Sequence, residues 1–310
     1  MASQTLVEAK KFINDDIVAG VVQDIIDINP MYAVLPFTSY MGQAILTNRE
    51  LALGDAGFYA VDATITNKAA STYTQVPFSA VKIIGDVEMD NLVQATSSSA
   101  GVDQLAIEIS SKAKQVGRLF QTGMATGDGV APNMNSLHSL VDSGQFTGAS
   151  AGQALSFALL DELLDLVKAK DGQVDWIMMP ARTMRSYRVL LRALGGVAMN
   201  EVVTLDDGRT VLGYEGIPIF RNDFLSVTET ANGASLTTGT LTSVWAGCVD
   251  DGSQKIGISG IYPESVPAGV NIEFIGQLEA KDSSLVRVKQ YTNFVNFNRK
   301  GIARLPSINN

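Results

Sequence analysis

The side chains that most often perform catalysis are scarce in this sequence. The chain of 310 residues contains a single histidine, His138, and a single cysteine, Cys248. One imidazole leaves little for acid–base chemistry near neutral pH, and zinc sites usually need several His or Cys ligands. His138 lies in an alternating segment, which indicates a strand residue with a local hydrogen bond. Cys248 has no neighbouring base, which indicates a small buried residue. We therefore expect no catalytic residues, no metal site and no cofactor.

Motifs that carry known chemistry are also missing. The sequence has no G-x-x-x-x-G-K-[ST] phosphate loop and no G-x-S-x-G nucleophile elbow. The glycines of GMATGDG at 123–129 have no lysine after them and no strand before them. Adjacent acids occur at 15–16, 161–162 and 206–207, but neighbours on a helix or turn do not face each other as paired carboxylates must. These doublets are typical of solvated charge.

The charge balance argues against two classes of partner. The formal net charge is -9, from 23 basic and 32 acidic residues. Nucleic-acid and anionic-membrane surfaces need clustered Lys and Arg, which this balance disfavours. The first residues, MASQTLVEAKKF, lack the long apolar region of a signal peptide. The apolar stretches of the sequence are far shorter than the roughly 20 residues that span a bilayer. We expect a soluble protein from a reducing cytoplasm, without a membrane partner.

The first 41 residues read as an arm. A partly helical apolar pattern runs over residues 5–28, is interrupted by Gly20 and ends at Asn29 and Pro30. The apolar stretch MYAVLPF at 31–37 is too short for a core helix. Two interpretations remain open for it: a strand on the chain's own core, or a segment covered by a neighbouring subunit.

Residues 42–90 read as β structure. Strand formers at 58–65 and 73–78 predict a hairpin with a small, polar tip at 67–71. Many of its residues are small or hydroxylic, so the hairpin has little apolar surface for packing on its own domain. An isolated two-stranded hairpin is marginal in water. We therefore expect it to contact a partner elsewhere.

The clearest helix is predicted over residues 99–125. Its apolar stripe recurs at helical spacing, and consists of Val102, Leu105, Ile109, Ala113, Val116 and Phe120. Serines at 97–99 offer an N-cap, and Gly123 and Gly127 offer stops. Residues 130–145 are expected to form a loop and a short strand.

From residue 155 the pattern changes to α/β. A helix near 155–167 precedes the strand WIMM at 176–179, and Pro180 begins a second helix. Four arginines of that helix fall within about one third of its circumference: Arg182, Arg185, Arg188 and Arg192. Three interpretations remain open for this face: solvated charge, an ion-pair surface between subunits, or a phosphate site. A turn and strand follow at 213–220, and the Gly/Thr/Ser-rich stretch 228–243 is expected to be an exposed loop.

The two ends of the chain carry opposite charge. Residues 281–310 contain six basic residues and one acid, whereas residues 1–100 contain five basic and eleven acidic residues. Alternating strands are expected over 270–297. We expect the two ends to meet, within one chain or between chains.

In this order, the elements and motifs resemble the major capsid proteins of tailed double-stranded DNA phages, which have the HK97-like fold. The stretch at 31–37 resembles the family's L-P-F arm, and GFYAVD at 57–62 resembles the start of its extended E-loop, with Phe-Tyr in place of Trp and Asp62 where Glu is common. GDGVAP at 127–132 resembles the G-D-G-x-x-x-P turn after the spine helix.

Later motifs continue the resemblance over nearly the whole chain. WIMMP at 176–180 resembles the strand–helix pair of the A-domain. LGYEGIPI at 212–219 resembles the L-G-x-P-V strand, with an insertion of three residues before the proline. NFV at 293–295 and the tail to Ile308 resemble the closing strand of the P-domain.

The resemblance implies an α+β, HK97-like fold with four parts. These are an N-terminal arm (1–41), an extended E-loop hairpin (42–80), a P-domain (81–145 and 267–310) with the spine helix at about 99–125, and an α/β A-domain (146–266).

The resemblance also implies function. The chain would be a structural, non-enzymatic major capsid protein that self-assembles into hexamers and pentamers of an icosahedral phage head enclosing double-stranded DNA. Hairpin and arm would be covered by neighbouring subunits, so a deletion of 62–74 is expected to leave a folded monomer that forms no shells. The candidate inter-subunit contacts are Arg49, Lys68, Asp161, Glu162, Asp165, Arg182, Arg185, Arg188 and Arg192.

Further partners follow from the same resemblance. Copies of the chain itself come first, followed by a portal, a decoration protein and non-specifically held DNA. Since the sequence starts at Met1 directly with the arm, we expect a separate scaffolding protein or prior removal of a leading segment. The expected location is the virion, after assembly in the host cytoplasm. Some relatives join an E-loop lysine to a neighbour's asparagine, but no acceptor for Lys68 can be identified in the sequence.

Three other functions remain open. An encapsulin-type shell would hold cargo enzymes instead of DNA. A carboxylate-dependent hydrolase would be a monomer with a concave acidic site. A phage tail or adhesin module would account for the Thr/Gly-rich β segments, although the long helix counts against it.

Overall fold

The computed structural model describes most of the chain. The described residues are 35–99, 104–148, 152–168, 173–193, 202–205, 208 and 210–309. The helix expected over 5–28, residues 31–34 of the apolar arm segment, and the acid doublets at 15–16 and 206–207 lie outside them.

A five-stranded sheet forms one half of the body. Its order is β1 (Phe37–Tyr40), β10 (Ile258–Pro263), β12 (Ser283–Asn296) and β11 (Asn271–Gln277), and β4 (Val81–Asp90) pairs with β12. The first part of β12 lies between β11 and β4, whereas its last residues pair with β10. The strand β1 is parallel to β10, and Leu35 before it is buried in the core of the same chain. Of the two interpretations of the arm segment, the described residues from Leu35 onward follow the first.

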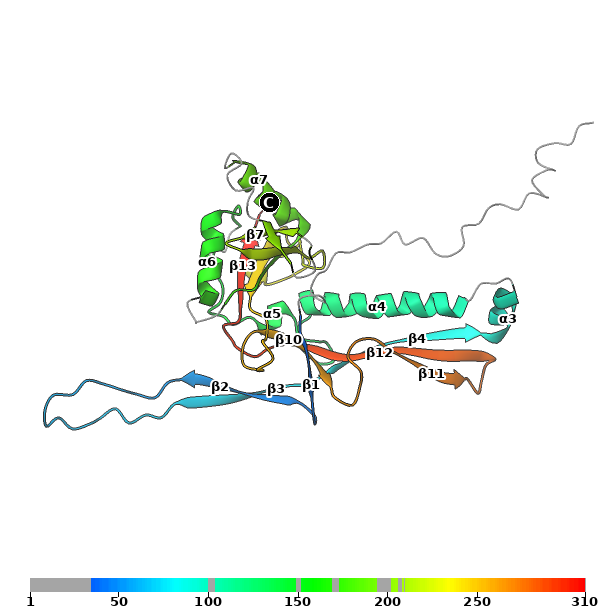
Figure 1. Ribbon diagram of the computed structural model, residues 1–310, viewed down its shortest axis with the longest axis horizontal. Helices are drawn as coiled ribbons and strands as arrows, with labels where there is room; N and C mark the ends of the chain where they lie inside the picture. Colours follow the sequence, from blue (N-terminus) through cyan, green and yellow to red (C-terminus); the bar gives the residue numbers. More distant parts are fainter. Residues whose placement is uncertain are drawn as a thin grey trace, which may run out of the picture.

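A long helix covers one face of this sheet. The helix α4 (Gln104–Thr126) packs on β4 and β12, as Figure 1 shows, and is preceded by the short helix α3 (Asn91–Ser99). Leu105, Val116 and Phe120 of the predicted stripe are buried, which confirms the helix and its inner face. The predicted N-cap is wrong, because residues 97–99 belong to α3. At about 1.5 Å per residue, α4 is about 35 Å long.

The helix ends where a side chain would not fit. The amide of Gly127 donates to the carbonyl of Gly123 (2.8 Å) just after the last helical residue. A Cβ on Gly127 would lie 2.5 Å from that carbonyl oxygen and 2.7 Å from the carbonyl oxygen of Met134. Glycine is therefore required for the chain to turn back toward α5 (Leu137–Leu140).

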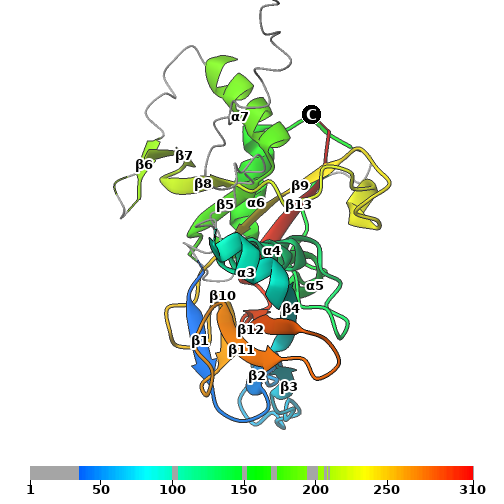
Figure 2. The same ribbon diagram turned by 90° about the vertical axis from the view of Figure 1, so that its right-hand side faces the viewer.

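A six-stranded sheet forms the other half of the body, above α4 in Figure 2. In sheet order, its strands are β13 (Ile302–Ile308), β9 (Thr242–Gly247), β5 (Trp176–Met179), β8 (Ile217–Arg221), β7 (Thr210–Tyr214) and β6 (Val202–Thr204). The helices α6 (Phe157–Lys168) and α7 (Ala181–Ala193) cover one face of this sheet, which confirms the predicted α/β segment. A short 3-10 helix, η2 (Ala231–Gly233), lies in the loop before β9.

The two sheets share one hydrophobic core. Along β5 the side chains alternate: Ile177 and Met179 pack with α6 and α7, whereas Trp176 and Met178 pack with Phe120 of α4. Since the other face of the α/β sheet is buried against the spine helix, both halves form one continuous packed unit.

Two strands lie in a different sheet from the one that the predicted ranges imply. The strand β10 falls within 146–266 but pairs with β12 in the five-stranded sheet, and β13 falls within 267–310 but pairs with β9 in the six-stranded sheet. The chain thus crosses between the halves more often than a simple insertion requires. Local patterns do not reveal this, because strand pairing depends on residues far apart in sequence.

Candidate inter-subunit interface

A two-stranded hairpin projects from the body, away from α4 (Figure 1). Its strands are β2 (Ile45–Ala52) and β3 (Thr72–Phe78), which pair in antiparallel register from Ile45–Phe78 to Ala52–Thr72. In the described structure, this pair forms a sheet of its own with two strands only. Such a sheet is marginal unless something packs on it.

Residues 53–71 continue the hairpin as an irregular loop. The amide of Asp55 donates to the carbonyl of Ala69 (2.9 Å), and the amide of Gly54 to the hydroxyl of Ser71 (3.0 Å). Farther out, the hydroxyl of Tyr59 accepts from the amide of Asn67 (2.7 Å). These bonds hold the loop in shape without regular strand pairing.

The predicted hairpin is right in kind and wrong in its first strand. Residues 58–65 form no strand and include the outer turn, where Asp62 has a positive φ of 65°. The strand that pairs with β3 is β2, earlier in the chain. Strand propensity measures packing against neighbours, and the exposed residues of this loop have none within the subunit. Lys68 lies exposed on the returning side of the loop, away from this turn.

The loop carries large apolar side chains in contact with solvent. Phe58 is fully exposed, and Val61 is 94% exposed. The other large exposed apolar residues of hairpin and loop are Leu46, Leu51, Leu53, Tyr59, Ile65 and Tyr73. Large apolar side chains gathered on one exposed element are typical of a site of association.

Arg49 joins the hairpin to the body. Its Nε donates to the carbonyl of Phe297 (3.1 Å) and its Nη2 to the carbonyl of Asn296 (2.5 Å), while the guanidinium lies 5.5 Å from the centre of the Phe78 ring. Burial, followed by the charge of Arg299, lowers the pKa of Arg49. Although Arg49 was a candidate inter-subunit contact, its guanidinium is engaged within the subunit.

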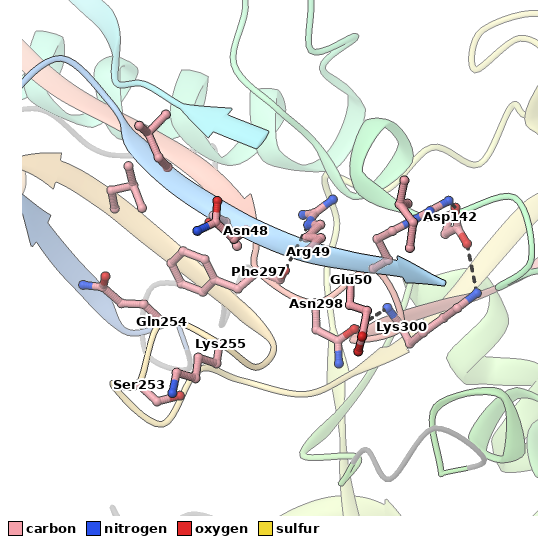
Figure 3. Close-up of a pocket in the computed structure, with 15 residues that line it drawn as sticks. Asn48, Arg49, Glu50, Asp142, Ser253, Gln254, Lys255, Phe297, Asn298 and Lys300 are labelled. Atoms are coloured by element: carbon pink, nitrogen blue, oxygen red, sulfur yellow. Dashed lines mark hydrogen bonds and ion pairs between the residues drawn. The ribbon is translucent and has the colours of Figure 1, made fainter. Parts of the chain in front are cut away.

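A cleft of about 710 Å³ lies at the hairpin base, between β2 and three loops of the body (Figure 3). Its cations are Arg49, Lys255, Arg299 and Lys300, and its acids are Glu50 and Asp142. Asp142 forms ion pairs with Arg299 and with Lys300, the latter at 2.9 Å. Burial acts to raise the pKa of Asp142, but the hydrogen bonds from these two cations outweigh it and lower the pKa. This cleft is not the acidic pocket that a carboxylate-dependent hydrolase needs.

The arginine face of α7 is solvent-exposed over most of its length. Arg185, Arg188 and Arg192 are exposed, whereas Arg182 is partly buried and donates to the carbonyl of Thr240 (2.5 Å). The side chain of Arg188 also contacts the sulfur of Met184 (3.7 Å). Three of the four predicted arginines therefore remain directed outward.

The acids proposed to meet these arginines lie on α6. Asp161 accepts from the hydroxyl of Tyr214, and Glu162 accepts from the hydroxyl of Thr147 (2.8 Å). Asp165 is exposed. No ion pair between the α6 acids and the α7 arginines is present among the described residues, so the pairing stays a prediction about neighbouring subunits.

Further exposed apolar side chains, which were not predicted as contacts from the sequence, lie on β11 and α3. Ile272 and Phe274 of β11 are exposed, as are Leu92 and Val93 of α3. Ile272 and Phe274 pair with Val288 and Val286, which are buried, but α4 covers β12 and β4 and leaves β11 open. The alternation over 270–274 was the sequence signal for this apolar face of β11. It does not indicate whether another element covers the face.

Of the two rare nucleophile or base candidates, Cys248 is buried and His138 is largely buried. Burial, followed by the charge of Asp175, raises the pKa of the Cys248 thiol to about 11, which makes it unreactive. The prediction for His138 is wrong: it lies on the short helix α5, because Ser136 and Ser139 form a capping box there.

The described part of the chain contains neither a cluster of metal ligands nor a membrane-spanning helix. No group of three or more His, Cys, Asp or Glu residues there is placed to hold a metal ion. No helix in the same part is long and apolar enough to cross a membrane.

Comparison with known proteins identifies the fold. No protein-family model and no curated protein matches the sequence. Solved structures match over the whole chain. The capsid of Cyanophage A-1(L) has a TM-score of 0.74 at 12% identity, over 98% of this chain and 99% of that one.

Two further matches also cover nearly the whole of both chains. The capsid of a native GTA particle has a TM-score of 0.68 at 11% identity, over 100% of both chains. The holo-SrpI encapsulin complex from Synechococcus elongatus has a TM-score of 0.68 at 17% identity, over 100% of this chain and 97% of that one. The chain therefore has the α+β, HK97-like fold of phage capsid and encapsulin shells, as the sequence predicted. These similar structures are shells and not enzymes.

Proposed function

We propose that this chain is the major capsid protein of a tailed phage, which self-assembles into hexamers and pentamers of an icosahedral head around double-stranded DNA. The observation that carries the proposal is the hairpin loop 53–71. It is held in a defined shape, yet it presents Phe58 and Val61 to solvent. A side chain of this size gains about 1.5–3 kcal/mol when it moves from water to an apolar contact.

Repetition explains why such modest contacts suffice. In a closed ring, each subunit gives one hairpin to a neighbour and receives one. The exposed apolar side chains of α3 and of β11 offer further apolar surface. Many weak contacts that form together hold an assembly more tightly than any one of them does. We propose that the chain is divided into the four parts of shells with this fold: the arm (1–41), the hairpin (42–80), the P-domain and the A-domain. The strands β10 and β13 are exceptions, since each pairs in the sheet of the other half.

The charge of the chain supports an enclosing role. A formal charge of -9 keeps the wall from binding the phosphate backbone along its whole surface. We propose a separate scaffolding protein, a portal and a decoration protein as further partners, with DNA held non-specifically. The head would assemble in the host cytoplasm and remain in the virion.

The structure sharpens the deletion that tests this proposal. Removing 62–74 would cut into β3, whereas replacing 56–68 with Asn-Gly keeps the pairing of Asp55 with Ala69 and closes the hairpin with a two-residue turn. We expect this variant to fold, with unchanged circular dichroism, and to form no shells in negative-stain images or by mass photometry.

A double substitution tests the same loop without shortening it, and a single substitution elsewhere is its control. Phe58→Ser with Val61→Ser removes exposed apolar surface, so the free energy of unfolding should change by less than about 0.5 kcal/mol while assembly is lost. Val130→Ser removes an exposed apolar side chain outside the hairpin and should leave assembly intact. Normal shells from both hairpin variants would overturn the proposal.

An encapsulin-type compartment is the second candidate. The Synechococcus elongatus encapsulin matches the whole chain as well as the GTA capsid does. Shells from infected or lysogenic cells should contain double-stranded DNA if the first proposal holds. A bound cargo enzyme and no nucleic acid would favour the second, and the ratio of absorbance at 260 and 280 nm with mass spectrometry of the contents distinguishes them.

A further inference from the structure

A buried charge cluster lies between the α/β sheet and the loop that precedes β9. Arg304 of β13 donates from Nη2 to Oε2 of Glu229 (2.9 Å) and from Nε to the hydroxyl of Ser243 (2.9 Å). The hydroxyl of Ser243 also donates to Oε2 of Glu229 (2.5 Å). The side chains of Arg304 and Glu229 are 4% and 1% exposed, so this pair is almost removed from water. The stretch 228–243 is therefore not the wholly exposed loop that its composition predicted.

The one histidine of the chain faces this pair. Nε2 of His138 lies 3.6 Å from Oε1 of Glu229, beyond hydrogen-bonding distance, and is buried without a hydrogen-bond partner among the described residues. Its ring packs edge-on against Trp245, at 4.7 Å between ring centres, and Arg304 lies over the same indole at 5.2 Å. The charged groups that face the imidazole are Glu229 on the loop and Arg304 on β13.

Glu229 holds the loop 226–241 against the body. Three backbone hydrogen bonds close the loop. The amide of Glu229 donates to the carbonyl of Leu241 (2.9 Å), and the amide of Leu241 donates to the carbonyl of Glu229 (3.0 Å). The amide of Gly239 donates to the carbonyl of Thr228 (2.7 Å). The rest of the loop has few apolar anchors, since most of it is Thr, Ser, Gly and Asn and since Leu236 and Leu241 are only partly buried. Glu229 is the buried charged anchor of the loop, beside hydrogen bonds from Arg182 to the carbonyl of Thr240 and from the amide of Asn232 to the hydroxyl of Ser307.

We propose that His138 makes the closed state of loop 226–241 acid-sensitive: the closed loop holds the imidazole neutral, and a proton on His138 favours the open loop. In the closed state one carboxylate already neutralises one guanidinium. A protonated imidazole would place a second buried cation beside Arg304 with one anion between them, which is costly. Opening the loop gives the imidazole access to water, where it takes up a proton readily.

The direction of the pH effect follows from linkage. Burial, followed by the charge of Arg304, lowers the pKa of His138 from 6.5 to about 3 in the closed state. The open state binds a proton that the closed state does not, so closure is fully present above pH 6.5 and weakens by about tenfold per pH unit below it. Burial raises the pKa of Glu229, against the opposing effects of Arg304 and Ser243, and this acts in the opposite direction. A comparison with variants that lack only the imidazole separates the two effects.

Hydrogen exchange of the full-length chain at pH 7 and pH 5 tests the proposal. After correction for intrinsic exchange rates, the amides of Glu229, Gly239 and Leu241 should exchange about 20-fold faster at pH 5 in the wild type. Amides of the β4–β12 ladder serve as the internal reference. His138→Phe keeps a ring against Trp245, and His138→Gln keeps a polar group that does not titrate.

Both variants should lose the acid-dependent acceleration in the loop, while the reference amides remain unchanged. Since the chain has no other histidine, an effect centred near pH 6.5 that disappears in either folded variant is assigned to His138. Equal acceleration in the wild type and in both variants would overturn the proposal, as would a wild type without acceleration.

Discussion

Arg49 was predicted as a contact between subunits, but its guanidinium binds groups of its own subunit. Its two hydrogen bonds to backbone carbonyls and its position over Phe78 fasten the base of the hairpin. The hairpin can thus project from the body while its base stays fixed. At the residue scale, the charged groups at the hairpin base orient the surface that we propose for assembly.

Arg49→Ala should therefore weaken the subunit itself. Hydrogen bonds from a charged donor contribute about 1.5–3 kcal/mol, and partial exposure reduces this, so we expect a loss of about 1–2 kcal/mol in the free energy of unfolding, measured with urea on unassembled subunits. Arg221→Ala is the control, because Arg221 forms an exposed pair with Asp223 and should cost less than about 0.5 kcal/mol. Equal losses of unfolding free energy in the two variants would contradict the anchoring role of Arg49.

Asp142 predicts how the hairpin base responds to acid. Its pKa in the folded state lies below the ordinary 3.8, because the hydrogen bonds from Arg299 and Lys300 outweigh the opposing effect of burial. The stabilisation is therefore present above pH 3.8 and lost as the pH falls through the lower folded value. Urea titrations between pH 5 and pH 2.5 should show a steeper loss for the wild type than for Asp142→Asn. Parallel curves would show that the ion pairs of Asp142 contribute nothing to the free energy of unfolding.

At the scale of elements, part of the hairpin follows from its sequence. Residues 73–78 form a strand as predicted, since β3 contains them. Residues 58–65 have the same strand formers but no partner strand, and they form the loop. Sequence propensity identifies residues suited to a pleated surface, and it cannot say whether a second strand lies beside them.

The helices α6 and α7 make a testable pair between subunits. If the arginine face of α7 meets the acids of α6 in a neighbour, Arg185→Glu with Arg192→Glu should reduce shell yield at least tenfold without changing the melting temperature of the monomer. Adding Asp165→Arg should restore part of the yield, because opposite charges then face each other again. Size-exclusion chromatography measures the yield. Without any loss in the first variant, the face is solvated charge.

On the scale of the whole molecule, the two sheets act as one body. The core that contains Phe120 of α4 also contains Trp176 and Trp245 of the six-stranded sheet. A body with this core responds as one unit, since tightly packed side chains cannot shift independently.

Phe120→Ala should thus destabilise both halves at once. Replacing a fully buried phenylalanine costs about 3–5 kcal/mol. The fluorescence of the two tryptophans in the sheet and the helical circular dichroism should shift together to lower urea. Leu119→Ala is the control, because Leu119 is 52% exposed on the same helix and should cost under about 1 kcal/mol. Two separate transitions would show that the halves unfold independently.

The sequence by itself determined what depends on local pattern. The buried stripe of α4, the α/β segment, the scarcity of catalytic side chains and the order of parts that resembles HK97-like capsid proteins were all readable, because periodicity records which face of an element is covered. The glycine that ends α4 was readable for the same local reason.

Only the tertiary structure decided which distant segments meet. It placed β10 and β13 in opposite sheets, made 58–65 a loop, and left β11 uncovered. It also brought Glu229, Arg304 and His138 together from three separate segments. Strand pairing and the burial of a charge both depend on partners far along the chain, and no local pattern encodes the identity of those partners.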